Sequence, residues 1–274
     1  MAEDLNAVEG HAIGYTPQTV WRGRRQSAAH AFLCSASKRP NLRVKPDVEV
    51  LRVIVGDGRA IGVPSGAATV RRILVQTVIL SAGALNSPKL LQLPGIGDPE
   101  HLRSLGIEVK AAKPGAGQNL REHCVLRPQC RLRRGSANAA YRGTGRQPAA
   151  LCAAGQRSAD HCGVRDNRDR SNGAWTGPAR RAAGLSPVSQ EFAREGFEVE
   201  REPGPLCASY IIRPESRGAI QVTGADPMEP PRISPSYLAE DYDRRAIALF
   251  RVTRAFIRAG TVGRLCRMRD AARS

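Results

Sequence analysis

The chain has 274 residues, and its 42 Lys and Arg against 25 Asp and Glu give a formal net charge of +17. This length suffices for one large domain or two ordinary ones, each with a sizeable core. No window approaches the roughly 18 consecutive apolar residues of a membrane span, and the first residues lack the basic and apolar regions of a secretory signal. We therefore expect no integral membrane segment.

The basic charge is a weak indication of function. Of the 42 basic residues 37 are Arg, they are scattered along the chain, and only 4% of residues are aromatic. Scattered Arg with few stacking rings argues against single-strand binding, and Arg-rich composition also follows from GC-rich coding sequence. We predict no nucleic-acid partner. The alternative is a non-catalytic Arg-rich protein that binds nucleic acid through phosphate contacts, with a steep salt dependence.

The seven cysteines are odd in number and widely spaced, and no two of them form a C-x-x-C pair. This pattern predicts a reduced, cytoplasmic protein without a structural zinc site. We expect Cys266 to be an inert core thiol. His161 stands beside an acid and a cysteine, but it lies in a stretch without apolar pattern, so we attribute that grouping to chance composition.

Two short apolar runs between Val50 and Val63 flank Gly56-Asp57-Gly58, which predicts a β-hairpin. The glycines here could instead be taken for a phosphate-binding loop. A dinucleotide-binding loop requires a helix directly after its glycines, however, and this segment continues as a strand. The Gly115-Ala-Gly117 run is an equally poor match.

The next predicted strand, Val70 to Leu80, ends in a turn of small residues at 81–84. Small residues at the carboxyl end of a strand allow close approach of a ligand to the backbone. A short helix should follow, with Asn86 or Ser87 as its cap and Pro88 at its first position. It should stop at Pro94-Gly95.

A second helix is predicted with Asp98 as its cap, Pro99 at its first position and Gly106 beyond its end. The strand Ile107 to Val109 should follow. The order of strand, small-residue turn, two helices and strand indicates an α/β arrangement.

The sequence VILSAGALNSPKLLQLPGIGDPEHLRSLGIEVKAAKPGAGQNLREH (78–123) resembles the second signature region of the glucose-methanol-choline (GMC) oxidoreductases. The S-A-G-A-L-x-S-P-x-L-L run, the following G-I-G and the later G-x-N-L-x-x-H agree in order and spacing, while Pro94 stands where the family usually has serine. Residues 23–33 and 39–55 resemble the segment before this signature, and 201–238 resemble the sheet of the family's substrate domain.

The resemblance implies FAD as cofactor and oxidation of a small alcohol, choline-like or another primary alcohol, to a carbonyl compound. In the family a C-terminal histidine takes the hydroxyl proton and the flavin accepts the hydride. Val50 falls where a strand backbone contacts the adenine, and Ser81, Ala82 and Gly83 fall near the ADP moiety. The alternative for these four residues is ordinary hairpin and strand-end packing. His123 also matches a family position, where we favour a structural role over contact with the flavin.

The chain departs from the family in two places that bear on activity. The G-x-G-x-x-G loop with which the family opens is absent before Ala12, so we expect the chain to begin partway through the FAD domain. Its last residues contain C-R-M without a neighbouring histidine, and the last histidine is His161. The sequence therefore offers no catalytic residue, and an inactive flavoprotein fragment stays a further alternative.

The stretch 136–184 is rich in Arg, Ala and Gly and almost free of large apolar residues, so we expect it to be disordered or poorly packed. Two compensating frameshifts would account for it. Residues 241–260 predict an amphipathic helix that packs on a sheet, with a membrane-surface or partner helix as alternative.

The fold class predicted is α/β plus α+β: a partial FAD-binding domain of the FAD/NAD(P) type over 1–125, then a substrate-binding domain with an antiparallel sheet and helices over 126–274. The sequence does not determine the oligomeric state.

Overall fold

A computed structural model describes residues 4, 7, 12–15, 17–22, 24–65, 71–74, 76–127, 130–132, 162–166, 168–169, 173–174, 181–186, 190–193, 196–200, 204, 206–248 and 266–268. By contacts the chain divides into two compact units. Unit 1 comprises residues 1–42, 123–214 and 241–274, and unit 2 comprises 43–122 and 215–240. Both units are therefore assembled from separate stretches of chain, whereas the predicted domains follow one another in sequence.

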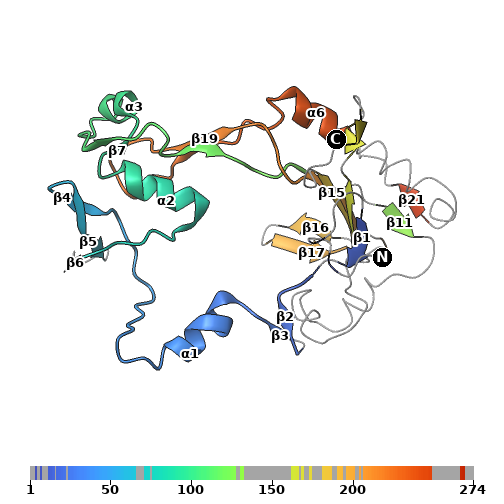
Figure 1. The fold of residues 1–274 in the computed structure, drawn as a ribbon, viewed down its shortest axis with the longest axis horizontal. Helices are drawn as coiled ribbons and strands as arrows, with labels where there is room; N and C mark the ends of the chain where they lie inside the picture. Colours follow the sequence, from blue (N-terminus) through green and yellow to red (C-terminus); the bar gives the residue numbers. More distant parts are fainter. Residues whose placement is uncertain are drawn as a thin grey trace. The chain divides into compact units, whose positions relative to one another are not determined.

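A three-stranded antiparallel sheet in unit 2 contains β4 (Ile54–Gly56), β5 (Arg59–Ser65) and β6 (Arg71–Leu74), in that order (Figure 1). Asp57 and Gly58 connect β4 to β5 with φ angles of 48° and 72°. Two successive positive φ angles are those of a type I′ turn, which matches the twist of the strands it joins. The predicted hairpin is confirmed, and the phosphate-loop alternative is wrong because the chain continues as a strand.

The two predicted helices of unit 2 are present, but one begins earlier than predicted. Helix α2 spans Gly83–Gln92, with Ala82 as its cap and Pro88 inside it. We predicted that the helix begins at Pro88, and this is wrong. The missing N–H of Pro88 removes one hydrogen bond, and the remaining hydrogen bonds and packing of the helix offset that loss. Helix α3 spans Pro99–Ser104 as predicted, and the Asp98 side chain accepts a 3.0 Å hydrogen bond from the Glu100 N–H.

Both strands predicted next to these helices differ in the structure. Of the described residues in the segment 70–80 only those of β6 form a strand. Residues 77–80 have no regular secondary structure, and Ile79 is 84% exposed. The predicted strand Ile107 to Val109 is also wrong. The parallel pair is formed instead by β7 (Ile96–Gly97) and β8 (Ala111–Ala112). A strand is defined by its neighbour, which local sequence does not specify.

The core of unit 2 joins residues distant in sequence. Strand β19 (Gly218–Gln221) lies between β20 (Arg232–Ser234) and β9 (Gln118–Leu120), and it packs on α2. Beside it, Leu102 and Ile107 form a buried apolar cluster with Val222. Burial of such side chains stabilises the fold by about 1.5–3 kcal/mol each. The segment 215–240 is thus an integral part of the unit.

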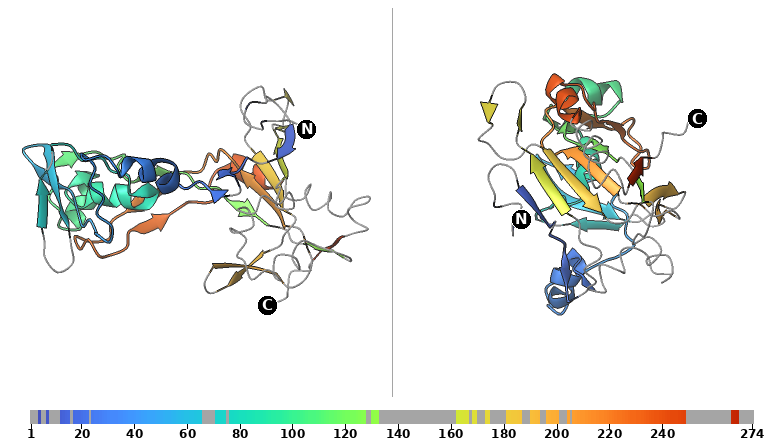
Figure 2. Two further views of the ribbon diagram at one scale, coloured as in Figure 1. Left: turned by 90° about the horizontal axis from the view of Figure 1, so that it is seen from below. Right: turned by 90° about the vertical axis from the view of Figure 1, so that its right-hand side faces the viewer.

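Unit 1 is built around a five-stranded antiparallel sheet, whose strands lie side by side in the right-hand view of Figure 2. Its strands, in spatial order, are β1 (Ala12–Tyr15), β12 (Cys162–Asp166), β15 (Arg181–Ser186), β18 (Leu206–Ile211) and β10 (Val125–Leu126). In β18 every second residue is buried, which shows that one face of this strand is covered.

Strand β12 and the first residues of β15 fall in the stretch 136–184, for which we expected disorder or poor packing. The two strands pair through backbone hydrogen bonds, and such a ladder does not require large side chains. Residues 133–161, with His161, lie outside the described residues, as do 249–265 of the predicted C-terminal helix. Helix α6 (Asp241–Ile247) represents its described part and packs against β18.

The remaining elements of unit 1 are short. They are β2 (Val20–Trp21), β3 (Arg24–Arg25), η1 (Ala29–Leu33), α1 (Cys34–Ala36), β11 (Cys130–Leu132), β13 (Arg168–Asp169), β14 (Gly173–Ala174), β16 (Gln190–Ala193), β17 (Gly196–Val199) and β21 (Cys266–Met268). Within the described parts of both units, every helix is too short or too polar to cross a membrane.

Candidate functional site

Three of the four predicted cofactor-contacting residues form the turn that leads into α2. Ser81 and Ala82 precede the helix, and Gly83 begins it with a φ of 83°. The Ala82 N–H donates a 3.1 Å hydrogen bond to Oγ of Ser87, one turn into the helix. This bond holds the turn in place from the helix side and leaves the opposite side open.

The turn is exposed and leaves room for a ligand. Residues 81–86 are all exposed, and a Cβ added to Gly83 would meet no atom within 4 Å. The Ala82 side chain cannot cap α2, so the first N–H groups of the helix face the turn without a side-chain acceptor from the cap. Uncapped N–H groups and the helix dipole favour a negatively charged group here.

Val50 lies in the exposed segment 43–50, also in unit 2. It forms an isolated β-bridge, and its side chain is 38% exposed. The structure therefore places all four predicted residues in one unit, with three of them contiguous. These features suit the ADP part of FAD. Val50 offers a β-bridge backbone and a partly exposed apolar side chain, and residues 81–83 form an open turn of small residues.

The fit does not extend to the whole cofactor. The printed sequence contains no G-x-G-x-x-G run to hold a pyrophosphate in the manner of the family. The fit of the four residues therefore concerns one end of FAD only, and we assign no flavin-ring contact.

His123 contacts the rest of unit 1 through a hydrogen bond and through stacking of its ring. Its Nε2 lies 2.8 Å from the Ile212 carbonyl oxygen, and its ring stacks on Tyr210 with a centroid distance of 5.9 Å. A ring N–H that donates to this carbonyl connects residue 123 to the end of β18. These contacts support the loop-ordering role that we expected for His123.

The described cysteines of unit 1 differ in their surroundings. Burial raises the pKa of the Cys207 thiol, and for Cys124 burial and then the negative charge of Asp243 raise the pKa. Cys34 is exposed. A raised pKa keeps a thiol protonated at neutral pH, so neither Cys124 nor Cys207 has the character of a nucleophile.

Two polar side chains that the sequence did not point to connect the signature helices of unit 2 to Val222. Gln92 is 2% exposed; its Nε2 donates to the Ile220 carbonyl at 2.9 Å, and its Oε1 accepts from the Val222 N–H at 3.1 Å. The Nε2 of His101 lies 3.0 Å from the Val222 carbonyl oxygen. The side chain of Gln92 thus acts as an additional backbone partner beside β19, and it fixes α2 and with it the turn at its start.

Comparison with known proteins agrees with this arrangement. Residues 2–125 match the family model described as GMC oxidoreductase. The similarity to that family thus covers the first part of the chain. Both the exposed turn at 81–83 and the signature helices lie within this match.

The chain is similar to several curated choline dehydrogenases. It is 45% identical over 130 residues to the oxygen-dependent choline dehydrogenase of Sinorhizobium medicae, a match that covers 45% of this chain and 23% of that protein. It is 41% identical over 128 residues to the mitochondrial choline dehydrogenase of Homo sapiens, covering 46% of this chain and 22% of that one. The chain thus matches less than a quarter of the length of these relatives.

Solved structures show the same fold over a longer stretch. An FAD-dependent oxidoreductase from Chaetomium thermophilum aligns with all of this chain and with 54% of its own, with a TM-score of 0.75 and 19% identity. Pyridoxine 4-oxidase from Mesorbium loti aligns with 95% of this chain and 48% of its own, with a TM-score of 0.73 and 20% identity. The predicted fold class, an FAD-binding α/β fold joined to an antiparallel sheet with helices, is confirmed.

Proposed function

We propose that the chain is part of an FAD-dependent oxidoreductase that acts on the CH–OH group of a small alcohol. The observation that carries this proposal is the family match over residues 2–125, within which the signature turn is open and faces solvent. Similarity to choline dehydrogenases supports choline or another primary alcohol as the substrate.

The residues of the turn would hold one end of the cofactor. Ser81, Ala82 and Gly83 offer backbone atoms without bulky side chains, and Val50 offers a β-bridge backbone and an apolar surface. Bound FAD supplies the acceptor for the carbinol hydride. The histidine that removes the hydroxyl proton in the family has no counterpart after His161, so we assign no catalytic residue.

We propose separate roles for the two domains that the sequence predicts. In this proposal residues 1–125 serve cofactor binding and 126–274 serve substrate binding, although the compact units are interleaved along the chain. We also propose that the protein works in a reducing compartment such as the cytoplasm, as the odd number and wide spacing of its cysteines indicate.

Flavin binding by the full chain tests the proposal. Since the residues fit only one end of FAD, we expect the purified chain to lose flavin during gel filtration. In a titration with millimolar FAD, we expect the backbone amide NMR signals of Val50 and of residues 81–83 to shift. A yellow protein that keeps stoichiometric flavin would refute the weak binding, and unchanged signals at these residues would refute the contact itself.

A matched pair of variants separates cofactor contact from strain. Gly83 and Gly58 both have positive φ and open space around a would-be Cβ, so Leu imposes a similar backbone cost at either position. Gly83→Leu should abolish the FAD-induced shifts because its side chain fills the turn, whereas Gly58→Leu should leave them unchanged. Equal effects of both variants would show that the turn does not contact FAD.

A further inference from the structure

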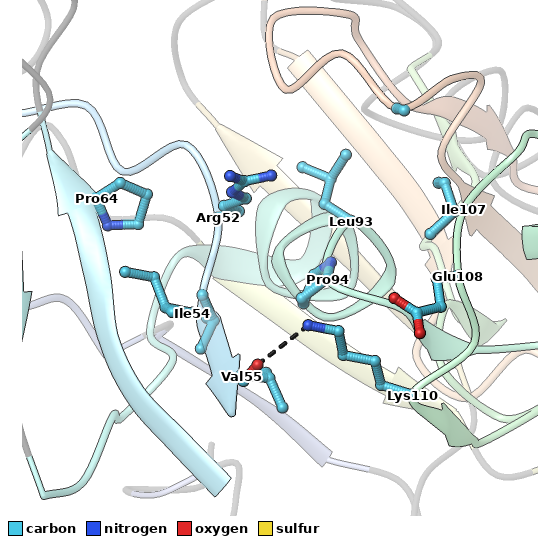
Figure 3. Close-up of a pocket in the computed structure, with 11 residues that line it drawn as sticks. Arg52, Ile54, Val55, Pro64, Leu93, Pro94, Ile107, Glu108 and Lys110 are labelled. Carbon is cyan, nitrogen blue, oxygen red and sulfur yellow. Dashed lines mark hydrogen bonds between the residues drawn. The ribbon is translucent and has the colours of Figure 1, made fainter. Parts of the chain in front are cut away.

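A pocket of about 410 Å³ lies within unit 2. None of the residues that line it has a role in the proposed function. Its walls come from the segment leading into β4, from β5, from the end of α2, and from the chain after α3 (Figure 3). This volume lies within the range of about 300–1,000 Å³ typical of small-molecule sites. The pocket is therefore large enough for a ligand rather than for a few waters only.

The apolar part of the pocket is buried and comes from separate elements. Val53 is 5% and Ile107 7% exposed, and Pro64 and Pro94 are also buried. Ile107 belongs to the apolar cluster of the unit, so this surface rests on the core and is held in shape by it. Such a surface suits the apolar body of a ligand.

The charged part of the pocket consists of three exposed side chains, those of Arg52, Glu108 and Lys110. The Lys110 Nζ donates a 3.0 Å hydrogen bond to the Val55 carbonyl, drawn as a dashed line in Figure 3, which holds the amine at the pocket. Among the described residues, the Arg52 guanidinium takes part in no hydrogen bond or ion pair. Two cations and one carboxylate give the pocket a net charge of +1.

The geometry points to a binding site for a small monocarboxylate with an apolar body. The guanidinium of Arg52 has the planar donor pair that matches a carboxylate, and Lys110 retains two further N–H groups for the same anion. Glu108 repels a second negative charge, which favours a monoanion over a phosphate or a dicarboxylate. The apolar body lies against Val53 and Ile107.

Titration of the full chain with 4-phenylbutyrate tests this site, with backbone amide shifts in NMR as the readout. We expect the amides of Val53, Ile107 and Lys110 to shift, and we expect 4-phenylbutyramide and 4-phenylbutylamine to bind at least about tenfold more weakly. Equal affinity for the three compounds would overturn the assignment of an anion site. The absence of shifts at these amides would overturn the site altogether.

Variants identify the groups responsible. Arg52→Gln should weaken binding of 4-phenylbutyrate about tenfold or more, because it removes a charge-assisted hydrogen bond to the carboxylate. Arg52 is exposed, so we expect the fold of the variant to be unchanged. Arg103→Gln is the matched control, since Arg103 is an exposed Arg of α3 in the same unit and does not line the pocket. If Arg52→Gln binds as tightly as Arg103→Gln, Arg52 is not a ligand of the carboxylate.

Addition of FAD to the same sample distinguishes this proposal from the function proposed above. Shifts at 81–83 on addition of FAD report the cofactor turn, and shifts at Val53 and Ile107 on addition of 4-phenylbutyrate report the pocket. Each can occur without the other. Loss of either set therefore refutes one proposal and leaves the other standing.

Discussion

Replacement of Gln92 tests whether the hydrogen bonds of its side chain to Ile220 and Val222 stabilise unit 2. Gln92→Ala removes the partners of the Ile220 carbonyl and of the Val222 N–H, and both residues are at most 3% exposed. Each buried polar group left without a partner costs about 1–3 kcal/mol. Two such groups give about 2–6 kcal/mol. Because water entering the space would replace part of the loss, we expect about 3 kcal/mol.

Hydrogen exchange of a peptide covering 215–240 is the assay of choice. The chain has two compact units, so its global unfolding need not be two-state, and a local readout is more informative. A loss of about 3 kcal/mol accelerates exchange at Val222 roughly hundredfold. Gln118→Ala, at an exposed Gln of β9 in the same unit, is the control and should leave this exchange unchanged.

A second variant, Gln92→Glu, tests how the destabilisation of unit 2 depends on pH. In Gln92→Glu the carboxylate faces the Ile220 carbonyl, so burial and this oxygen raise the pKa of the new acid above its unfolded value of about 4.3. The destabilisation should therefore be small below that pH, where a neutral acid can donate to the carbonyl, and should grow as the pH rises above it. Exchange at Val222 that is unchanged in Gln92→Ala, or independent of pH in Gln92→Glu, would refute the reasoning.

Three further outcomes are expected. Gly117→Ala should destabilise unit 2 at least about 2 kcal/mol more than Gly58→Ala, as measured by hydrogen exchange in 215–240. Both glycines have positive φ, but of the two only Gly117 would bring a Cβ against a backbone oxygen, that of Ile220. Equal exchange in the two variants would contradict this. Asp98→Ala should cost about 1 kcal/mol through loss of the α3 cap, measured by exchange in 98–106, and no change would show that the cap is dispensable. At pH 8 iodoacetamide should modify the exposed Cys34 well before Cys207. Burial shields the Cys207 thiol and raises its pKa, so less thiolate is present. Equal modification rates in peptide mapping would contradict the burial of Cys207.

The parts of the fold that the sequence predicted correctly depend on neighbouring residues. The type I′ turn needs positive φ at two successive positions, and Asp57-Gly58 supplies them. In the same way α3 begins at a side-chain cap and a proline and ends before Gly106, all within nine residues. Signals of this kind are complete in the local sequence.

The parts that the sequence did not predict depend on partners far along the chain. Residues 77–80 have the composition of a strand, but a strand forms only where another strand pairs with it. Gln92 stands among leucines as an apparent surface residue of a helix, and its partner Ile220 lies 128 residues further on. A polar residue at the end of an otherwise apolar helix face was the one available signal.

The candidate site was predicted from the resemblance, and the structure adds its local geometry. Ser81 to Gly83 are exposed at the start of α2, which agrees with an open turn, although the helix begins there and not at Pro88 as predicted. The carboxylate pocket gave no sequence signal, since Arg52 and Lys110 are ordinary surface residues until the fold brings them together.

The route by which Val222 reaches Gln92 has a consequence for synthesis on the ribosome. The two residues are separated by 130 positions, so the core around α2 and α3 lacks an essential strand when residue 122 emerges. At about 5–20 residues per second, on the order of ten seconds pass before that strand is available. During this interval the nascent signature region exposes the apolar surface that β19 and Val222 later cover, which makes it a natural client for chaperones that bind unfinished chains.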